Sequence, residues 1–291
     1  YIMGENPAMS DPDLNHARHS LAQLEHLVVQ DIFFTETASF ADVILPASAF
    51  PEKTGTFTNT DRRVQLGRAA VATPGDAKPD IEIIQEIANR IGLNWIDCTP
   101  ENVFSEMTKT MDSISGITWA QLEERDSVTY PYTLDNPESE TVLFREKFDL
   151  IDGYAKFAPA HFSHAAELPD AEYPLVLITG RQLEHWHTGT MTRRSSTLDA
   201  LEPDAVISLN AADLMSSGIK ENDIVKLTSR RGSITAQAKS DKGLQKGNVF
   251  MPFCYAEAAV NLLTISAIDP IGKIPEFKHC AVRIEKPKDS D

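Results

Sequence analysis

Cysteine is scarce in this sequence, and no two cysteines form a CxxC pair. The 291 residues include three, namely Cys98, Cys254 and Cys280. Zinc knuckles and iron–sulfur clusters need closely spaced cysteines, so these thiols alone cannot build either kind of centre. An odd number of widely spaced cysteines also argues against a disulfide framework, and it favours buried thiols in a reducing compartment.

Long apolar runs and an excess of positive charge are missing as well. The longest apolar candidates, 41–45 and 260–265, have the length of a strand, whereas a membrane-spanning helix needs about 20 residues. The 43 acidic residues outnumber the 27 basic ones and give a net charge of −16. Because nucleic acids and anionic membranes attract basic surfaces, we expect neither of them as a partner.

Glycine-rich phosphate loops of the Rossmann or P-loop type are absent, as is any Ser-His-Asp or Cys-His set. The most informative stretch that is present reads LITGRQLEHWHTGTMTRR, at 177–194. A β-branched run stops there at Gly180, and a loop rich in arginine, histidine and threonine follows, with Glu184 as its one acid. Such a loop suits an anion such as a pyrophosphate, although a solvated turn with aromatic packing explains it equally well.

The first ~110 residues alternate helix and strand signals. Apolar residues at spacings of three and four predict helices that begin at Asp11-Pro12 and at Pro79-Asp80. Apolar runs predict strands at 26–34 and 41–45, with an extended stretch at 54–60. This alternation predicts that 1–112 is part of a Rossmann-like α/β domain with a parallel sheet.

The pattern of apolar and polar residues changes in the second half of the chain. Residues 113–172 lose their periodicity and are interpreted as an ordered connector. From 173 to 291 the pattern is mostly β, with a hairpin turn at 229–232 and one helix at 210–218. Strands are expected at Leu175–Thr179, Val206–Leu209, Ile224–Thr228, Ile234–Ala238, Asn248–Phe253 and Ala281–Glu285. Several short strands around one helix predict a closed β-barrel, because closure removes exposed sheet edges.

Asp31 stands at the carboxyl end of an apolar strand, and Thr35 follows four residues later. Ligands of α/β sheets bind outside such strand ends. A carboxylate matches the adjacent N1–H and N2–H donors of guanine, so Asp31 suits a guanine edge or a ribose, with Thr35 adding a hydroxyl. The alternative is that these side chains cap a helix or a turn.

The loop after Thr179 carries further candidates. Arg181 offers a fork-shaped phosphate donor. His185 and His187 would share one face of an extended backbone, and because Glu184 would point to the other face, hydrogen bonding is favoured over metal binding. Near the C-terminus, rings and polar groups that could surround a planar ligand, or simply form aromatic core and a solvated lysine, are Phe253, Asn261, Phe277 and Lys278.

Four blocks of this sequence resemble one known family. They are GENPAMSDPD at 4–13, QDIFFTETASFADVILPASAFPEKTGTFTNTDRRVQ at 30–65, TGRQLEHWHTGTMTRR at 179–194 and DPIGKIPEFKHCAVRIE at 269–285. The family is the molybdopterin oxidoreductases of the dimethyl sulfoxide reductase group. Within it the blocks, together with GITWAQLEERDSVTYP at 116–131, are most similar to the catalytic alpha subunits of cytosolic, NAD-dependent formate dehydrogenases.

The resemblance implies a cofactor, namely molybdenum or tungsten held by two molybdopterin guanine dinucleotides. Residues 1–112 would be the C-terminal part of an α/β domain that contacts one dinucleotide, and 173–291 a double-psi β-barrel of the aspartate-decarboxylase-like type. Asp31 and Thr35 would hold a guanosine end. The residues implied to line the pterins and pyrophosphates are Arg181, Gln182, His185, His187, Phe253, Asn261, Phe277 and Lys278. Some relatives have tyrosine where this chain has Phe253 and Phe277, so only ring packing is expected there.

The resemblance also implies what this segment lacks. The iron–sulfur cysteines, the cysteine or selenocysteine that binds the metal, its neighbouring histidine and the substrate-orienting arginine would all lie upstream. Since Tyr1-Ile2-Met3-Gly4 resembles a strand entering a turn, we expect the chain to begin inside a domain. We therefore predict no catalytic or metal-binding residue in this segment, and no formate oxidation by it alone.

The implied partners of the intact subunit are formate, the rest of the alpha subunit, and flavin- and iron–sulfur-containing subunits like those of NADH dehydrogenases. The implied location is the cytoplasm. One alternative is a nitrate reductase of the same group, and another is a respiratory-complex subunit that has lost the cofactor and serves as a scaffold. A stand-alone dinucleotide carrier is disfavoured by the start of the chain. Retention of Asp31, Thr35, Arg181, His185 and Asn261 together argues against the scaffold.

Overall fold

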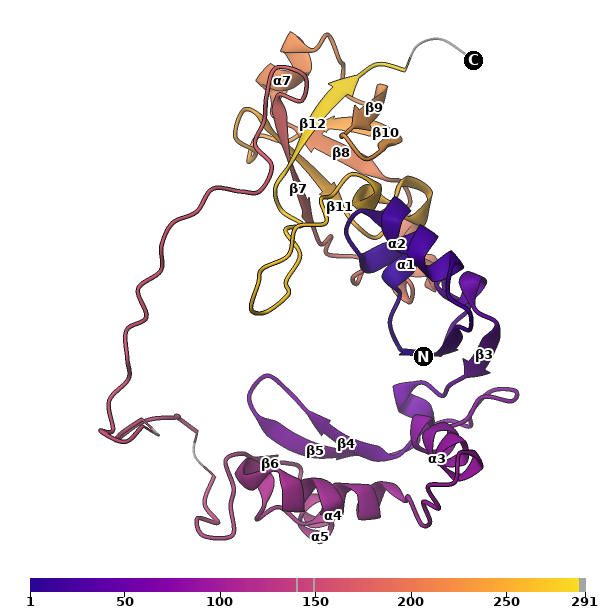
Figure 1. Cartoon of the computed structure of the whole chain (residues 1–291), viewed down its shortest axis with the longest axis vertical. Helices are drawn as coiled ribbons and strands as arrows, with labels where there is room; N and C mark the ends of the chain where they lie inside the picture. The colour runs from indigo at the N-terminus through magenta and orange to yellow at the C-terminus, as the bar shows by residue number, and fades with distance from the viewer. Residues whose placement is uncertain (140, 149, 288–291) are drawn as a thin grey trace. The chain divides into compact units, whose positions relative to one another are not determined.

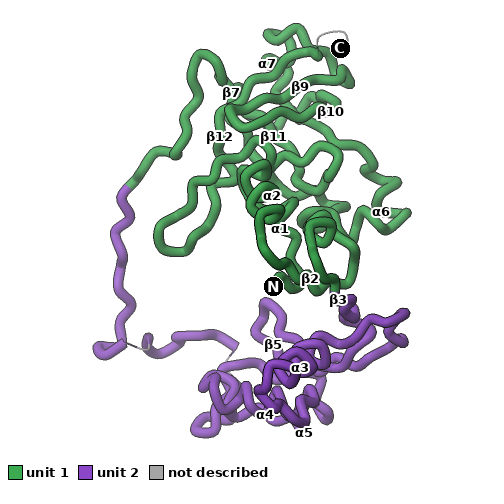
Figure 2. Tube along the Cα trace, turned by 45° about the vertical axis from the view of Figure 1, so that its right-hand side comes forward, with its two compact units in different colours: residues 1–44, 162–291 green, residues 45–161 purple. Residues whose placement is uncertain are grey.

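The computed structural model describes residues 1–139, 141–148 and 150–287. The chain forms two compact units, one made of residues 1–44 with 162–291 and the other of residues 45–161 (Figure 2). The first 44 residues thus group with the C-terminal barrel and not with the residues that follow them. This grouping differs from the sequence segments 1–112, 113–172 and 173–291, which stay a prediction.

A closed barrel of six strands dominates the first unit, with the strand order β10-β8-β11-β7-β12-β9 (Figure 1). The strands are β7 (Leu175–Gly180), β8 (Val206–Leu209), β9 (Ile224–Thr228), β10 (Ser233–Ser240), β11 (Asn248–Pro252) and β12 (Cys280–Glu285). The closed barrel is confirmed, and each strand lies within two residues of its predicted bounds. Its double-psi connectivity stays a prediction.

The interior of the barrel is filled by apolar side chains, which alternate with outward-facing ones most clearly on β9 and β10. On β9, Val225 and Leu227 are fully buried, and on β10 the small side chains of Ala236 and Ala238 occupy the interior. Strand β11 is parallel to β7 and β10 is parallel to β8, while the remaining neighbours are antiparallel. Parallel pairs need long connections, so chain segments cross the ends of the barrel.

The predicted turn and helix of the barrel are both present. In the turn between β9 and β10, the Ser229 amide donates to the Gly232 carbonyl at 2.9 Å. Helix α7 (Ala211–Ser216) begins after Asn210, whose side-chain oxygen accepts from the Ala212 amide at 2.9 Å. It ends before Gly218, which has a φ of +65° that favours glycine.

The N-terminal segment forms a small layer of helices and strands. Its elements are β1 (Ile2–Met3), α1 (Pro7–Ser10), α2 (Leu14–Ala22), β2 (Val28–Asp31), the 3₁₀ helix η1 (Ala38–Phe40) and β3 (Val43–Pro46). The sheet order is β1-β2-β3, and β1 runs parallel to β2. The predicted helix and strands are confirmed in place, whereas the Rossmann-like character of a larger domain stays a prediction.

The second unit contains a three-stranded antiparallel sheet and several helices. The strands are β4 (Gly55–Thr58), β5 (Arg63–Gly67) and β6 (Val128–Thr129), in that order. The helices are η2 (Phe50–Glu52), α3 (Asp80–Arg90), α4 (Pro100–Thr110), η3 (Asp112–Ile114) and α5 (Trp119–Glu124). No helix in the described part of the chain combines the length and the apolar character needed to cross a membrane.

The start of the predicted connector belongs to the core of this second unit. Ile117, Leu122 and Val128 are each 2% exposed, and they pack with Phe104 of α4. That 113–172 as a whole is an ordered connector stays a prediction. The sequence pattern gave no sign of α5 and β6, because short elements of six and two residues give too few repeats for a periodic pattern.

Glu167 ties the chain segment that precedes β7 to the barrel. Its two carboxylate oxygens accept from Arg231 Nη1 and Nη2, both at 2.8 Å, and one of them also accepts from the Ala281 amide at 2.8 Å. Burial alone would raise the pKa of the Glu167 carboxyl. The bonds from Arg231 and Ala281 and the charges of Arg231 and Arg230 outweigh this, so its pKa lies below the ordinary value.

We expect Glu167→Gln to lower the free energy of unfolding by about 1 kcal/mol at pH 7. A lowered folded-state pKa contributes stability above the unfolded-state pKa of about 4.3 and loses it as the pH falls through the folded-state value. The gap between wild type and variant in urea unfolding should therefore close in acid. Glu172→Gln is the matched control, because Glu172 is a more exposed partner of Arg283 (side chain 68% exposed). A gap that stays constant with pH would contradict this account.

Candidate cofactor-binding site

The loop that follows β7 is pressed against the end of β11. Gly180 is close to the Phe250 ring, since a Cβ at position 180 would lie 2.4 Å from that ring. Gly189 has a φ of +76°, and a Cβ there would lie 2.5 Å from the Cys254 carbonyl oxygen. These two glycines permit a close approach that fixes the path of the loop between them.

His185 holds this loop from inside. Its ring is 2% exposed, and its Nε2 lies 2.8 Å from the Glu202 carbonyl oxygen, which can only accept. Its Nδ1 lies 3.4 Å from Thr192 Oγ1, and that oxygen in turn accepts from the Trp186 amide. Because the Glu202 carbonyl can only accept, Nε2 carries a proton and donates to it.

Tyr255 completes the buried layer beneath the loop. The ring is fully buried and meets His185 edge to face at 5.8 Å. Its hydroxyl lies 3.1 Å from the Glu202 carbonyl oxygen and 3.3 Å from Gln182 Oε1. A tyrosine hydroxyl has one hydrogen, so it donates to one of these two oxygens at a time. A primary amide has two N–H donors and two acceptor sites, so the Gln182 side chain keeps donors for an external partner beside this contact.

The outer face of the loop gathers donors and planar rings. Arg181 Nη2 lies 3.1 Å from His187 Nε2, and the Arg181 guanidinium lies 5.5 Å from the Trp186 ring centre. The rings of Trp186 and His187 are 4.6 Å apart, and Phe253 lies 6.4 Å beyond His187. Arg181, Trp186 and His187 are exposed. A guanidinium, an imidazole and aromatic faces together suit phosphate oxygens and a flat heterocycle.

The prediction that His185 and His187 share one face is wrong. It assumed an extended backbone, but His187 has a φ of +49°, which turns the chain. His185 therefore points into the protein and His187 outward. Whether either ring contacts a cofactor stays a prediction.

The three arginines of the 177–194 window have different surroundings. Arg193 lies 2.6 Å from Asp199 and 3.0 Å from Glu257, so two carboxylates neutralise it. Arg194 donates to the Thr190 and Phe34 carbonyls. Arg181 has no carboxylate partner within the described residues. Its positive charge is thus the one most available to an anion.

Lys278 and Phe277 lie beside the end of β7. Lys278 Nζ donates to the Thr179 carbonyl at 3.0 Å, and Thr179 Oγ1 donates to the Phe277 carbonyl at 2.9 Å. The pairing of β12 with β7 brings them there. Lys278 is exposed, and an ammonium has three N–H donors, so it can hold this carbonyl and an anion together.

Asp31 is the last residue of β2, Thr35 lies four residues later, and both side chains cap the backbone. Asp31 Oδ1 accepts from the Phe33 amide at 3.2 Å, and Thr35 Oγ1 accepts from the Ala38 amide at 3.1 Å at the start of η1. Thr35 is 2% exposed. The capping role is therefore present, and a guanosine contact in addition to it stays a prediction.

Asn261 does not lie in the loop after β7, and its side chain contacts α1 instead. It lies in η6 (Val260–Leu262), is 3% exposed, and its Nδ2 donates to the carbonyls of Met9 at 3.0 Å and Ser10 at 3.1 Å. It therefore fastens α1 to the barrel, and its contact with a cofactor stays a prediction.

Sequence reasoning assigned no role to Asn6, Glu36 or Thr190, which connect the loop after β2 with the loop after β7. Asn6 Nδ2 lies 2.7 Å from Glu36 Oε2 and 3.1 Å from Thr190 Oγ1. All three stand inside the blocks that carry the family resemblance. The sequence contained their identities, but nothing in it paired residues 184 positions apart.

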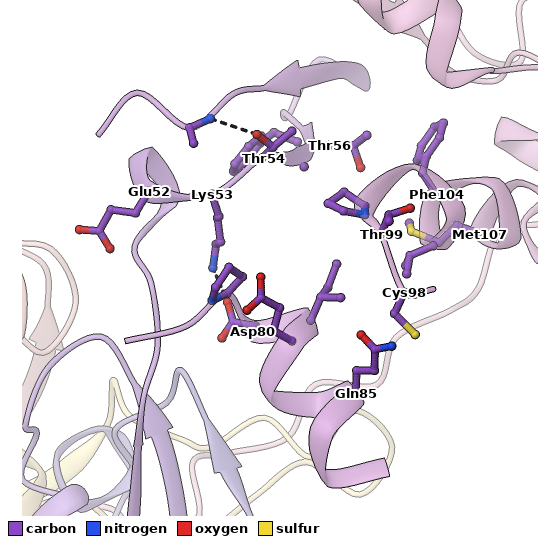
Figure 3. Close-up of a pocket in the computed structure, with 18 of the residues that line it drawn as sticks. Glu52, Lys53, Thr54, Thr56, Asp80, Gln85, Cys98, Thr99, Phe104 and Met107 are labelled. Atoms are coloured by element: carbon purple, nitrogen blue, oxygen red, sulfur yellow. Dashed lines mark hydrogen bonds and ion pairs between the residues drawn. The ribbon is translucent and has the colours of Figure 1, made fainter. Parts of the chain in front are cut away.

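A cavity of about 720 Å³ in the second unit is a poor site for a phosphorylated ligand (Figure 3). Its described lining includes Lys53, which forms an ion pair with Asp80, and three further acids, Glu52, Glu82 and Asp97. None of the predicted cofactor residues lines it. Within the described residues, no group of three or more histidine, cysteine or acidic side chains could hold a metal ion.

We expect His185→Ala to lower the free energy of unfolding by about 2 kcal/mol, because it opens a cavity and removes a donor from the Glu202 carbonyl. His187→Ala, two residues away and exposed, is the matched control and should change it by less than about 0.5 kcal/mol. Urea unfolding of both variants tests this. Equal losses in the two variants would show that His185 is not the internal fastening of the loop.

Comparison with known structures shows that this fold occurs in another protein. Acetylene hydratase from Pelobacter acetylenicus superimposes with a TM-score of 0.74 over 97% of this chain and 43% of its own, at 20% identity. That degree of identity shows a shared fold and nothing more.

Sequence comparison then defines the family. Residues 1–90 match the family described as "Molybdopterin oxidoreductase", and residues 175–281 match the "Molydopterin dinucleotide binding domain". The chain belongs to the molybdopterin oxidoreductase family. The two matches support a molybdenum or tungsten molybdopterin cofactor.

Two relatives of this chain carry the names of different enzymes. The chain is 46% identical over 290 residues to the F420-dependent formate dehydrogenase subunit alpha of Methanocaldococcus jannaschii, a match that covers 98% of this chain and 43% of the relative. It is 36% identical over 293 residues to the assimilatory nitrate reductase catalytic subunit of Bacillus subtilis, covering 98% and 41%. The chain thus spans less than half the length of these relatives.

Proposed function

We propose that this chain forms the cofactor-binding part of a formate dehydrogenase catalytic subunit. The observation that carries the proposal is the exposed group of Arg181, His187 and Trp186 at the end of β7, inside a segment that matches a molybdopterin dinucleotide binding domain. The 46% identity to a formate dehydrogenase alpha subunit supports formate as the substrate. Formate would yield carbon dioxide, one proton and two electrons.

The residues of this chain would bind and orient the cofactor. Arg181 and Lys278 supply positive charge for phosphate oxygens, and Gln182 and His187 supply neutral donors. Asp31 supplies acceptors for guanine, and Phe253 and Trp186 supply flat faces. When bound, the metal–pterin cofactor would supply the two-electron redox chemistry.

The remaining predictions concern the whole protein. Iron–sulfur clusters, flavin-containing partner subunits and a cytoplasmic location stay predictions, as does the inability of residues 1–291 alone to oxidise formate. A nitrate reductase remains a second candidate because one relative, at 36% identity, carries that name. Reduction of nitrate by the purified whole protein, without formate oxidation, would favour it. A whole protein without a pterin cofactor would favour the scaffold.

In the whole protein, Arg181→Ala should weaken cofactor binding by about tenfold to a hundredfold, because a charge-assisted bond to phosphate contributes about 1.5–3 kcal/mol. Asp31→Ala should also reduce cofactor content, through lost guanine contacts. Metal and pterin content per polypeptide measures both. Arg283→Ala is the control, since Arg283 pairs with Glu172 on the barrel. Normal molybdenum or tungsten content and normal formate turnover in both variants would refute the assigned roles.

The electron acceptor can be decided by a direct assay. The family resemblance implies NAD, whereas the relative at 46% identity is named F420-dependent, and we propose F420 for this chain. Whole protein with its partner subunits should bleach the visible absorbance of F420 when formate is added, and NAD should give no NADH absorbance. Formate-dependent NAD reduction without F420 reduction would restore the original prediction.

A further inference from the structure

Asn6 lies where two loops of the first unit meet. It is 7% exposed and directly precedes α1. Its Oδ1 accepts from the Thr37 amide at 3.2 Å and from the Thr37 hydroxyl at 2.8 Å. Its Nδ2 donates to Glu36 Oε2 at 2.7 Å and to Thr190 Oγ1 at 3.1 Å.

These four bonds use the full capacity of a primary amide, which has two acceptor sites and two N–H donors. They also fix which way the amide faces, because the Glu36 carboxylate can only accept and the Thr37 amide can only donate. An asparagine is therefore required here in one orientation, and neither a carboxylate nor an aliphatic side chain can replace it. A buried group this fully bonded is costly to disturb.

The partners of Asn6 belong to the two loops that carry the proposed cofactor residues. Glu36 and Thr37 follow Thr35 in the loop after β2, which begins directly after Asp31. Thr190 stands in the loop that carries Arg181 and His187. A second tie between the loops comes from Arg194, which donates to the Phe34 carbonyl at 2.8 Å and lies 4.9 Å from the Phe33 ring centre.

We propose that Asn6 is a positioning residue that sets the spacing between two loops before the cofactor binds. One is the loop after β2 (32–38), proposed to bind guanosine, and the other is the loop after β7 (181–194), proposed to bind the pterin. This inference rests on the proposed function. A large ligand held at two places binds more tightly when its two contact loops are already at the right separation, because less ordering is needed on binding. Asn6 touches no part of the ligand in this scheme and acts through the loops.

The test is Asn6→Asp in the whole protein, an almost isosteric change that removes both donors and sets a carboxylate against Glu36. Hydrogen exchange, measured without cofactor, should speed up about tenfold in peptides covering 31–38 and 181–194, and cofactor affinity should fall by a similar factor. Adding Glu36→Gln should rescue both, because the new amide can donate to the introduced carboxylate and the Thr190 hydroxyl can turn to donate to it.

Two further variants keep the test decisive. Asn222→Asp makes the same change at an exposed turn and should alter neither readout. Thr190→Val removes the bond from Asn6 and a bond to the Thr188 hydroxyl within the same loop, and it leaves the bonds of Asn6 to Thr37 and Glu36. It should therefore loosen 181–194 and leave 31–38 unchanged even if Asn6→Asp fails to fold.

The outcomes separate this inference from the proposed function. Unchanged exchange in both loops of Asn6→Asp, with wild type carrying its cofactor, would overturn the positioning role alone. Faster exchange with undiminished cofactor affinity would overturn it too, since the loops would be coupled without serving the ligand. A wild-type protein that contains no pterin would overturn the proposed function and the inference built on it, although the measured coupling of the loops would stand.

Discussion

The candidate site depends on hydrogen bonds that join the first 44 residues to the barrel. Asn261 of the barrel donates to the carbonyls of Met9 and Ser10, and Asn15 of α2 donates to the Arg231 carbonyl at 3.1 Å. These contacts link parts of the chain more than 200 residues apart. Together with the packing of Met9 and Leu14 on Ala259 and the bonds of Asn6 and Arg194, they keep the loop after β2 and the loop after β7 in one unit, so that a ligand could be held by both at a defined spacing.

The loop after β7 is supported by a buried layer of polar, hydrogen-bonded side chains. A loop normally presents backbone groups to water, but here the buried His185 and Tyr255 accept or donate to it from below. Burial raises the pKa of the Tyr255 hydroxyl well above its ordinary value, so the hydroxyl stays protonated and remains a donor. The outer face can therefore expose Arg181 and His187 in a set geometry without the loop collapsing onto the barrel.

Local sequence patterns predicted the strands of the barrel, but they did not predict that residues 1–44 pack with it. Alternating apolar residues such as Val225 and Leu227 carry the strand signal within a few positions, and Asn210 and Gly218 mark the ends of α7 in the same local way. The grouping of 1–44 with the barrel rests on contacts between distant residues, namely the apolar packing of Met9 and Leu14 on Ala259 and the hydrogen bonds from Asn261. A local pattern predicts an apolar helix face but does not say which distant surface that face will cover. Similarly, the positive φ of His187 reversed a face assignment that only an extended backbone would justify.

The predicted site residues differ in what a ligand contact would require of them. The polar atoms of Thr35, His185 and Asn261 are already bonded inside the protein, so a ligand would have to compete with existing hydrogen bonds. Arg181, His187 and Lys278 are exposed and can add a partner while keeping the bonds that orient them. Since a polyanion gains most from donors that need not be released, these exposed side chains are the ones whose chemistry best supports binding, and the buried ones serve by holding the loops that carry them.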